Sequence, residues 1–163
     1  LKYIHNEKEW NDFLSENSEN EKYIAEPFIK GPIVMVEIVR HPDSGKVVAV
    51  TRQEKLSTPH GCATAVYMYQ DSGLEENSRK LAEALDIKGC VNFEYIHGDD
   101  GKYYLVECNP RFSAGCEFTC ISGYDCVSNH LKVFEGKSID DFTFRHPMYI
   151  SRKYEEFITK VED

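Results

Sequence analysis

Short runs of β-branched and aromatic residues, separated by turns, dominate this sequence and limit the folds that it can adopt. Such runs are typical of β-strands, and His41-Pro42-Asp43-Ser44-Gly45 is a turn between two of them. Between residues 74 and 86 the apolar spacing becomes that of a helix. Because tight turns join antiparallel strands, we predict an α+β fold in which helices flank an antiparallel sheet. The predicted strands are 22–29, 33–40, 46–54, 63–69, 90–97 and 102–108, and the predicted helices follow Asn6 and span 74–86 and 125–135.

Two helix ends carry capping signals. Asn6 with Glu9 three residues later is the pattern of a capping box, and Trp10 and Phe13 then fall on one helical face. Gly136 is a residue type that favours the position just after a helix. We therefore predict that one helix begins after Asn6 and that another ends before Gly136.

The charge and composition exclude several classes of partner. The 163 residues carry a formal net charge of −9, which is poorly matched to a phosphate backbone, so no nucleic acid partner is expected. No apolar run reaches the roughly 18 residues of a membrane span, so no membrane association is expected. The six cysteines include no Cys-x-x-Cys pair. Without a secretory signal they indicate reduced thiols in a cytoplasmic protein.

The most informative segment is 89–111, where Gly98-Asp99-Asp100-Gly101 separates two alternating runs and predicts a hairpin. If the turn pairs His97 with Lys102, then Glu94 lies opposite Leu105 and Asn92 lies opposite Glu107. One face would carry polar side chains and the other would face the core. The polar face is predicted to hold Asn92, Glu94, Glu107 and Asn109, and the core face to hold Val91, Phe93, Tyr95, Tyr104, Val106 and Cys108.

Carboxylates gathered on one face repel each other, and burying them is costly. A divalent cation removes this penalty, and Mg²⁺ typically takes one or two carboxylates together with substrate phosphates. Arg111, two residues after Asn109, offers a planar set of donors suited to phosphate. One alternative is a solvated hairpin face without a ligand. A calcium or zinc module is another, but the sequence has neither EF-hand nor zinc-ligand spacing.

Glu94 followed by Glu107-Cys108-Asn109-Pro110-Arg111 resembles the signature of the ATP-grasp superfamily. The resemblance is to the ATP-binding halves of the carbamoyl-phosphate synthase large subunit and to related carboxylate–amine ligases, and it extends over about residues 22–137. It implies the fold of an ATP-grasp C-terminal subdomain. It also implies that Glu94, Glu107 and Asn109 bind Mg²⁺, with Mn²⁺ as an alternative, that both glutamates belong to the ATP site, and that Arg111 is catalytic and contacts the transferring phosphate.

The resemblance also implies where ATP lies. The stretch from Glu26 to Gly31, which includes Pro27, Phe28 and Ile29, matches the hinge that reads adenine in the family. His60 matches a histidine in a loop near the phosphates, and Arg52 and Lys55 precede that loop and could add positive charge. Read without the resemblance, Glu26-Pro27 is the start of an edge strand and His60 is a surface histidine.

This sequence departs from the family pattern in two respects. Pro32-Ile33-Val34 stands where many relatives have an acidic residue that binds ribose, and Glu37 comes later. The glycine-rich loop that covers the phosphates and the preceding substrate-side domain are expected upstream of Leu1. We therefore interpret residues 1–21 as the remainder of the small ATP-grasp subdomain and residues 22–163 as the C-terminal subdomain.

The predicted function is that of an ATP- and Mg-dependent ligase fragment. By the resemblance, it activates a small carboxylate as an acyl phosphate for attack by an amine or similar nucleophile. The fragment is expected to be inactive without the missing upstream domains, and a homodimer is left open. The alternative is a non-catalytic nucleotide-binding domain with a degenerate ribose site. The sequence does not identify the carboxylate or the amine.

Overall fold

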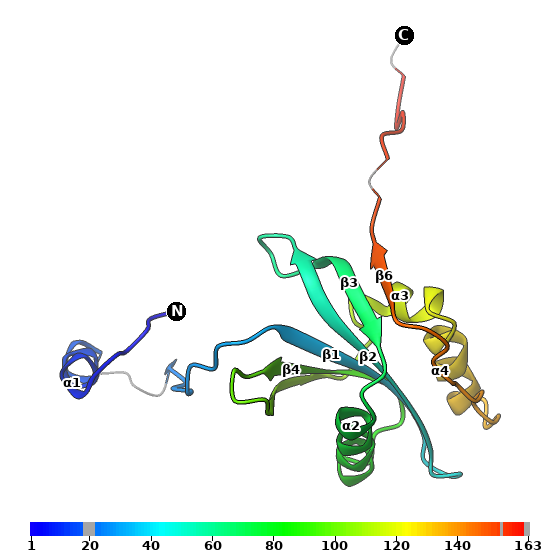
Figure 1. Cartoon of the computed structure of the whole chain (residues 1–163), viewed down its shortest axis with the longest axis horizontal. Coiled ribbons are helices and arrows are strands. Elements are labelled where there is room, and N and C mark those ends of the chain that lie inside the picture. Colours follow the sequence, from blue (N-terminus) through cyan, green and yellow to red (C-terminus); the bar gives the residue numbers. More distant parts are fainter. Residues whose placement is uncertain (18–21, 154, 162–163) are drawn as a thin grey trace.

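A computed structural model of the chain describes residues 1–17, 22–153 and 155–161, and one antiparallel sheet organises it (Figure 1). The sheet has six strands in the order β5-β4-β1-β2-β3-β6, which confirms the predicted α+β architecture. The strands are β1 (Ile33–His41), β2 (Lys46–Ser57), β3 (Ala63–Tyr69), β4 (Gly89–His97), β5 (Tyr103–Asn109) and β6 (Met148–Ser151), and the helices are α1 (Glu7–Glu16), α2 (Ser72–Ala84), α3 (Cys116–Ile121) and α4 (Cys126–Phe134).

Helices cover both faces of the sheet. Alternate strand residues point to opposite faces, so β1 contributes Val36 and Ile38 to one core and Val39 to the other. Helix α2 packs on the first of these faces through Leu74 and Ala82. Helices α3 and α4 pack on the second face. We call these two sides the α2 face and the α4 face.

Helix α1 lies apart from the sheet in Figure 1 and contributes no buried residue. The predicted N-cap is confirmed, because Asn6 Oδ1 accepts from the Glu9 amide at 2.9 Å. The return bond of the predicted capping box differs, because Glu9 Oε2 accepts from the amide of His5 at 2.9 Å and not from that of Asn6. At the other predicted end, Gly136 follows α4 with a φ of +68°, a conformation that glycine adopts readily. The predicted domain boundary after residue 21 falls at residues 18–21, outside the described part of the chain.

Three predictions about strands and helices were wrong or incomplete. Residues 23–30 form no strand: Pro27 has no amide hydrogen to donate, and the register of the sheet assigns this segment no partner. Helix α3 and strand β6 were not predicted. Strand β6 is only four residues long, and it is held by antiparallel pairing with β3, which a local pattern does not reveal.

The register of the β4–β5 hairpin also differs from the prediction. His97 pairs with Tyr103 instead of Lys102, so the turn is one residue longer. A bulge then leaves Val106 without a partner and shifts the register by one further residue in the same direction. Consequently Glu94 lies opposite Glu107, and Asn92 lies opposite Asn109.

The longer turn reverses the faces of the residues between it and the bulge, and the bulge restores the predicted faces beyond it. The polar side chains share the α4 face, as predicted, although their partners differ. Tyr104 pairs with Ile96 and so lies on the α4 face instead of the predicted core face, while Leu105 pairs with Tyr95 on the α2 face. Val106, also predicted in the core, is 46% exposed because it sits at the bulge.

Candidate functional site

Two glutamates meet on the α4 face where β4 and β5 pair. Glu94 is half-buried, Glu107 is exposed, and they are direct cross-strand partners. Burial raises the pKa of the Glu94 carboxyl, and the nearby carboxylates of Glu107 and Glu54 raise that pKa further, against a smaller lowering effect of Arg52. Glu54 was not predicted to belong here, although its alternation with Arg52 along β2 places it on the same face.

The end of β5 adds an amide and a guanidinium to the glutamates. Asn109 Nδ2 donates to Glu107 Oε1 at 2.6 Å. Arg111 Nη2 donates to Asn109 Oδ1 at 2.9 Å, and its Nη1 donates to the carbonyl of Phe112 at 3.1 Å. Both Arg111 and Glu107 are exposed. The Glu-x-Asn-Pro-Arg stretch therefore forms a chain of hydrogen bonds that runs from carboxylate to guanidinium on an open surface.

These residues fit a magnesium site that is completed by a ligand. Among the described residues, no group of three or more His, Cys, Asp and Glu side chains is arranged to hold a metal ion. Glu94, Glu107 and the oxygen of Asn109 supply fewer ligands than the octahedral shell of Mg²⁺ needs, and phosphates and water usually fill the remainder. The raised pKa of Glu94 beside Glu107 is also the electrostatic setting in which a cation stabilises both carboxylates.

The predicted adenine hinge lies at the end of the sheet where β1 begins. Glu26, Pro27 and Phe28 are exposed and Ile29 is half-buried. Gly31 fixes the path of this segment, because a Cβ there would lie 1.9 Å from the carbonyl oxygen of His97. The hinge is thus anchored against the β4–β5 hairpin that carries Glu94.

The cations predicted near the phosphates occupy different places. His60 is exposed in the loop between β2 and β3, at the same end of the sheet as the hinge. Lys55 lies 5.4 Å from the centre of the Tyr67 ring and donates to Gln53 at 2.6 Å, which places it on the α2 face. Arg52 is 2% exposed and pairs with Glu37 at 2.9 Å. Arg52 is therefore already paired with a carboxylate, although its charge still lowers the pKa of Glu94.

Two polar residues near the site were missed in the sequence. Ser113 is buried against Glu37 and Arg52. Arg152, just after β6, donates a hydrogen bond to the carbonyl of Ala114, and its guanidinium carbon lies 5.0 Å from the centre of the Phe118 ring. No local signal could have placed Arg152 here, because its position depends on the unpredicted pairing of β6.

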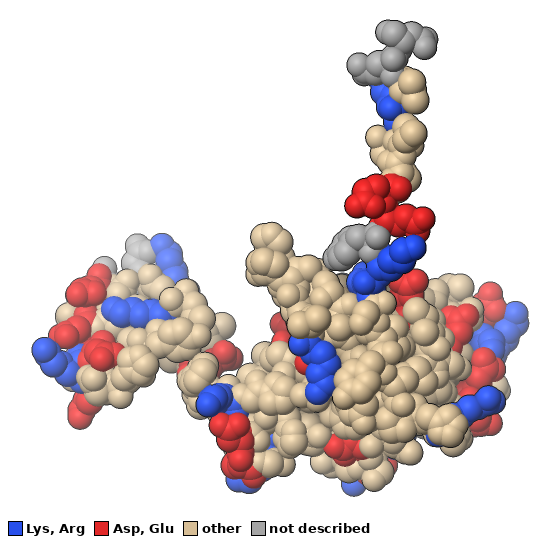
Figure 2. Space-filling model, turned by 45° about the horizontal axis from the view of Figure 1, so that its top comes forward, with Lys and Arg blue, Asp and Glu red and all other residues tan. Residues whose placement is uncertain are grey.

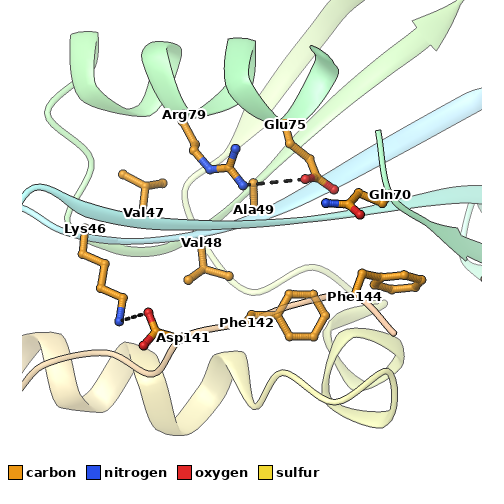
Figure 3. A pocket seen from close by; sticks show the side chains of 10 residues that line it. All are labelled: Lys46, Val47, Val48, Ala49, Gln70, Glu75, Arg79, Asp141, Phe142 and Phe144. Carbon is orange, nitrogen blue, oxygen red and sulfur yellow. Dashed lines mark ion pairs between the residues drawn. The ribbon is translucent and has the colours of Figure 1, made fainter. Parts of the chain in front are cut away.

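A cavity of about 270 Å³ lies elsewhere, between α2 and the segment that precedes β6 (Figure 3). Glu75 and Arg79 of α2 border it on one side, 3.6 Å apart. Lys46 and Asp141 form an ion pair of 2.7 Å on the other side. None of the predicted site residues lines this cavity.

Charged side chains are dispersed over the surface. In Figure 2, uncharged side chains occupy much of the middle of the visible face, and acidic and basic groups alternate around its periphery. This face carries no continuous basic surface.

A search of the helices among the described residues finds none with the length and apolar character needed to cross a membrane. The six cysteines are free thiols.

Comparisons with known proteins identify relatives of this chain. Curated relatives include the C-terminal section of the carbamoyl phosphate synthase large chain of Aquifex aeolicus, 28% identical over 151 residues, which cover 85% of this chain and 28% of the relative. The carbamoyl phosphate synthase large chain of Clostridium perfringens is 21% identical over 177 residues, which cover 98% of this chain and 16% of the relative. The chain therefore spans less than a third of these relatives.

Solved structures share the fold. A biotin carboxylase–β-γ-ATP complex from Campylobacter jejuni superposes with a TM-score of 0.67 at 23% identity, covering 86% of this chain and 35% of that one. The phosphoribosylaminoimidazole carboxylase ATPase subunit from Aquifex aeolicus gives a TM-score of 0.67 at 19% identity, covering 93% and 55%. A family model described as ATP-grasp in the biosynthetic pathway with Ter operon matches residues 19–156. The chain therefore belongs to this ATP-grasp family.

Proposed function

We propose that this chain forms the metal-binding part of the active site of an ATP-grasp ligase. Such a ligase activates a small carboxylate as an acyl phosphate for attack by an amine or similar nucleophile. The observation that carries the proposal is the pairing of Glu94 with Glu107, continued by Asn109 and Arg111 along the end of β5. Membership of the ATP-grasp family and similarity to carbamoyl phosphate synthase support the same class of chemistry.

Each residue has a separate part in the proposed reaction. Glu94 and Glu107 would hold Mg²⁺ or Mn²⁺ together with the oxygen of Asn109, and a bound metal would neutralise the phosphate oxygens of ATP. Arg111 would stabilise the negative charge on the transferring group through its planar donors. The exposed surroundings of these side chains leave room for a nucleotide on the α4 face.

The adenine would lie against the hinge. Backbone groups around Phe28 would read the base edge, with Glu26, Pro27 and Ile29 beside it, and His60 would approach the phosphates from the neighbouring loop. The biotin carboxylase neighbour is a complex with β-γ-ATP, which supports a nucleotide on this fold. We further propose that residues 1–21 belong to the small subdomain, that residues 22–163 form the C-terminal subdomain, and that the protein is cytoplasmic.

A specific observation favours a second candidate, a non-catalytic nucleotide-binding domain. Pro32-Ile33-Val34 supplies no acidic group for ribose, and Glu37 is buried in its ion pair with Arg52. Calorimetry with Mg·ATP, followed by an assay of ADP release in the complete protein, separates the two functions. Nucleotide binding without ADP release favours the second candidate.

The ligase proposal is tested by substitution in the complete enzyme. Glu107→Ala or Arg111→Ala should lower turnover by about 10²–10³-fold or more, because each removes stabilisation of charge in the transition state. Glu76→Ala and Arg145→Ala are matched controls, since both residues are exposed and lie outside the site. Turnover within a factor of about two of wild type in Glu107→Ala and Arg111→Ala contradicts the assignment.

A further inference from the structure

A buried charge pair lies directly beneath the loop that follows Arg111. Arg52 is 2% exposed and Glu37 is 1% exposed, and Arg52 Nη1 donates to Glu37 Oε2 at 2.9 Å. Burying two charges carries a large desolvation penalty, so such a pair is weak evidence for a stabilising role. The proposed reaction assigns neither residue a role.

The hydroxyl of Ser113 joins this pair to the loop. Ser113 Oγ donates to Glu37 Oε2 at 2.7 Å and accepts from Arg52 Nη2 at 2.9 Å. It also accepts from the amide of Gly115 at 3.2 Å, and the Ser113 amide donates to Glu37 Oε1 at 3.4 Å. One serine side chain therefore connects the loop to charges on β1 and β2.

The loop also packs closely on the guanidinium. A Cβ on Gly115 would lie 3.0 Å from Arg52 Nε and 3.1 Å from its Nη2, so a side chain fits there only if Arg52 or the loop gives way slightly. Gly115 has a φ of −104°, which other residues also adopt. The close approach to Arg52, and not backbone strain, therefore favours glycine at this position.

The buried pair shares its cross-strand rows with the proposed metal ligands. Along one row, Met35 alone stands between Arg52 on β2 and Glu94 on β4. Along the next row, Glu37 neighbours Asn92, whose other partner is Asn109. A shift of the pair or of the loop would therefore move the end of β5, where Asn109 and Arg111 lie.

We propose that Glu37, Arg52 and Ser113 are positioning residues, which clamp the loop after Arg111 and so fix Glu107, Asn109 and Arg111 for metal and phosphate. The metal part of this inference rests on the proposed function. Residues that orient metal ligands typically change metal affinity by about 10–100-fold when they are substituted.

The test uses two variants of the 163-residue chain that disturb the clamp differently. Ser113→Ala removes the shared hydroxyl. Gly115→Ala pushes the loop away from Arg52 without substituting Glu37, Arg52 or Ser113. Ser78→Ala is the matched control, because Ser78 is also a buried serine and its hydroxyl lies 2.9 Å from that of Tyr95 on the α2 face. If one clamp variant fails to fold, the other still decides the question.

Two measurements separate the clamp from the function. Hydrogen exchange of the 109–116 segment should accelerate about tenfold in both clamp variants, with the β1 amides unchanged, because only local hydrogen bonds are lost. Mn²⁺ affinity in the presence of ATP, measured by electron paramagnetic resonance, should fall about tenfold or more. Ser78→Ala should change neither.

Three results would overturn the inference, each in a different way. Exchange that is unchanged, or that rises equally throughout the sheet, means that the charge pair is only part of the core. Local exchange that rises without loss of Mn²⁺ affinity means that the clamp does not position the metal ligands. Absence of Mn·ATP binding in the wild-type chain contradicts the proposed function and the metal part of the inference, whereas the exchange result still reports on the clamp.

Discussion

Glu75 on the α2 face and Glu94 on the α4 face are two poorly solvated glutamates in opposite surroundings. Burial raises the pKa of both carboxyls. Arg79 lies 3.6 Å from Glu75 (Figure 3). Thr51 donates a hydrogen bond to Glu75 at 3.2 Å, and both Thr51 and Arg79 lower its pKa. Glu94 instead has Glu107 and Glu54 nearby, which raise its pKa further. The chain thus supplies partners for one carboxylate and adds like charge around the other.

This difference distinguishes a structural carboxylate from a candidate ligand. A buried carboxylate is tolerated when hydrogen bonds and an opposite charge accompany it. Glu75 meets that condition within the protein. Glu94 meets it only with a cation from outside, because the nearby Arg52 is already engaged by Glu37 and Ser113. The proposed metal site therefore lies on the α4 face and not in the cavity beside Glu75.

The largest expected effect concerns the buried charge pair that supports the α4 face. Arg52→Met should lower the free energy of unfolding by about 3–5 kcal/mol, because it leaves Glu37 buried without its partner. Urea unfolding followed by circular dichroism measures this loss. The double variant Arg52→Met with Glu37→Leu should recover much of the stability, since it removes both charges. A single variant as stable as wild type contradicts the described ion pair.

We expect metal affinity to respond differently when the site around Glu94 is altered and when Glu75 is altered. Glu107→Gln, which removes the partner of Glu94, should weaken Mn²⁺ affinity in the presence of ATP by about 10–100-fold, with little change in stability. Glu75→Gln should leave this affinity unchanged and also change stability little, because Glu75 lies on the α2 face and the amide oxygen of glutamine can still accept from Thr51. Calorimetric titration and thermal unfolding of both variants provide the test. Equal loss of metal affinity in the two variants removes the distinction.

A smaller effect should appear in the pH dependence of stability. The folded chain favours the neutral form of Glu94, so this group contributes stability below its unfolded pKa, and the contribution is lost as pH rises through the raised folded pKa. Without metal, wild type should lose stability relative to Glu94→Gln over that range. Mn·ATP should reverse this trend, because it binds the ionised carboxylate.

Urea unfolding at a series of pH values, with and without Mn·ATP, measures this linkage. Glu75 has a pKa shift of the same sign, so the Glu75→Gln variant is the appropriate control. Its pH dependence relative to wild type should not respond to Mn·ATP. A response of equal size in both variants means that the nucleotide acts on the fold as a whole.

The smallest expected effect concerns the partners of Glu75. Thr51→Val removes the hydroxyl that donates to this carboxylate and should lower stability by about 1 kcal/mol. Mn²⁺ affinity should not change. Thermal unfolding and metal titration of this single variant are sufficient, and a loss of metal affinity would show that the two faces are coupled.

The sequence predicted those parts of the fold that local pattern determines. Alternation and turn residues identified β1, β2, β3 and the β4–β5 hairpin, and they placed Asn92, Glu94, Glu107 and Asn109 on one face. The detailed pairing was wrong, because the longer turn and the bulge at Val106 each shift the register by one residue in the same direction. Each shift also reverses the face on which later residues lie, so the two reversals cancel and the four polar residues keep their predicted face.

Long-range contacts explain the remaining errors. The burial of Arg52 against Glu37 and Ser113 joins residues up to 76 positions apart, so Arg52 resembled a free cation in the sequence. Strand β6 and the contact of Arg152 with Ala114 depend on a pairing between distant segments. The adenine-binding role of the hinge and the role of His60 remain predictions, since exposed segments such as these are defined by what binds to them.

Locating Mn²⁺ on the protein by nuclear magnetic resonance tests the proposed metal site at Glu94 and Glu107 most directly. Mn²⁺ broadens the signals of nuclei close to it, so titration of the labelled chain with Mn²⁺ and ATP reports the position of the metal. We expect the amide signals of Glu94, Glu107 and Asn109 to broaden first, those around Glu75 to stay sharp, and Glu107→Gln to abolish the effect. Broadening centred on Glu75, or unchanged in Glu107→Gln, would show that the metal does not bind at the paired glutamates.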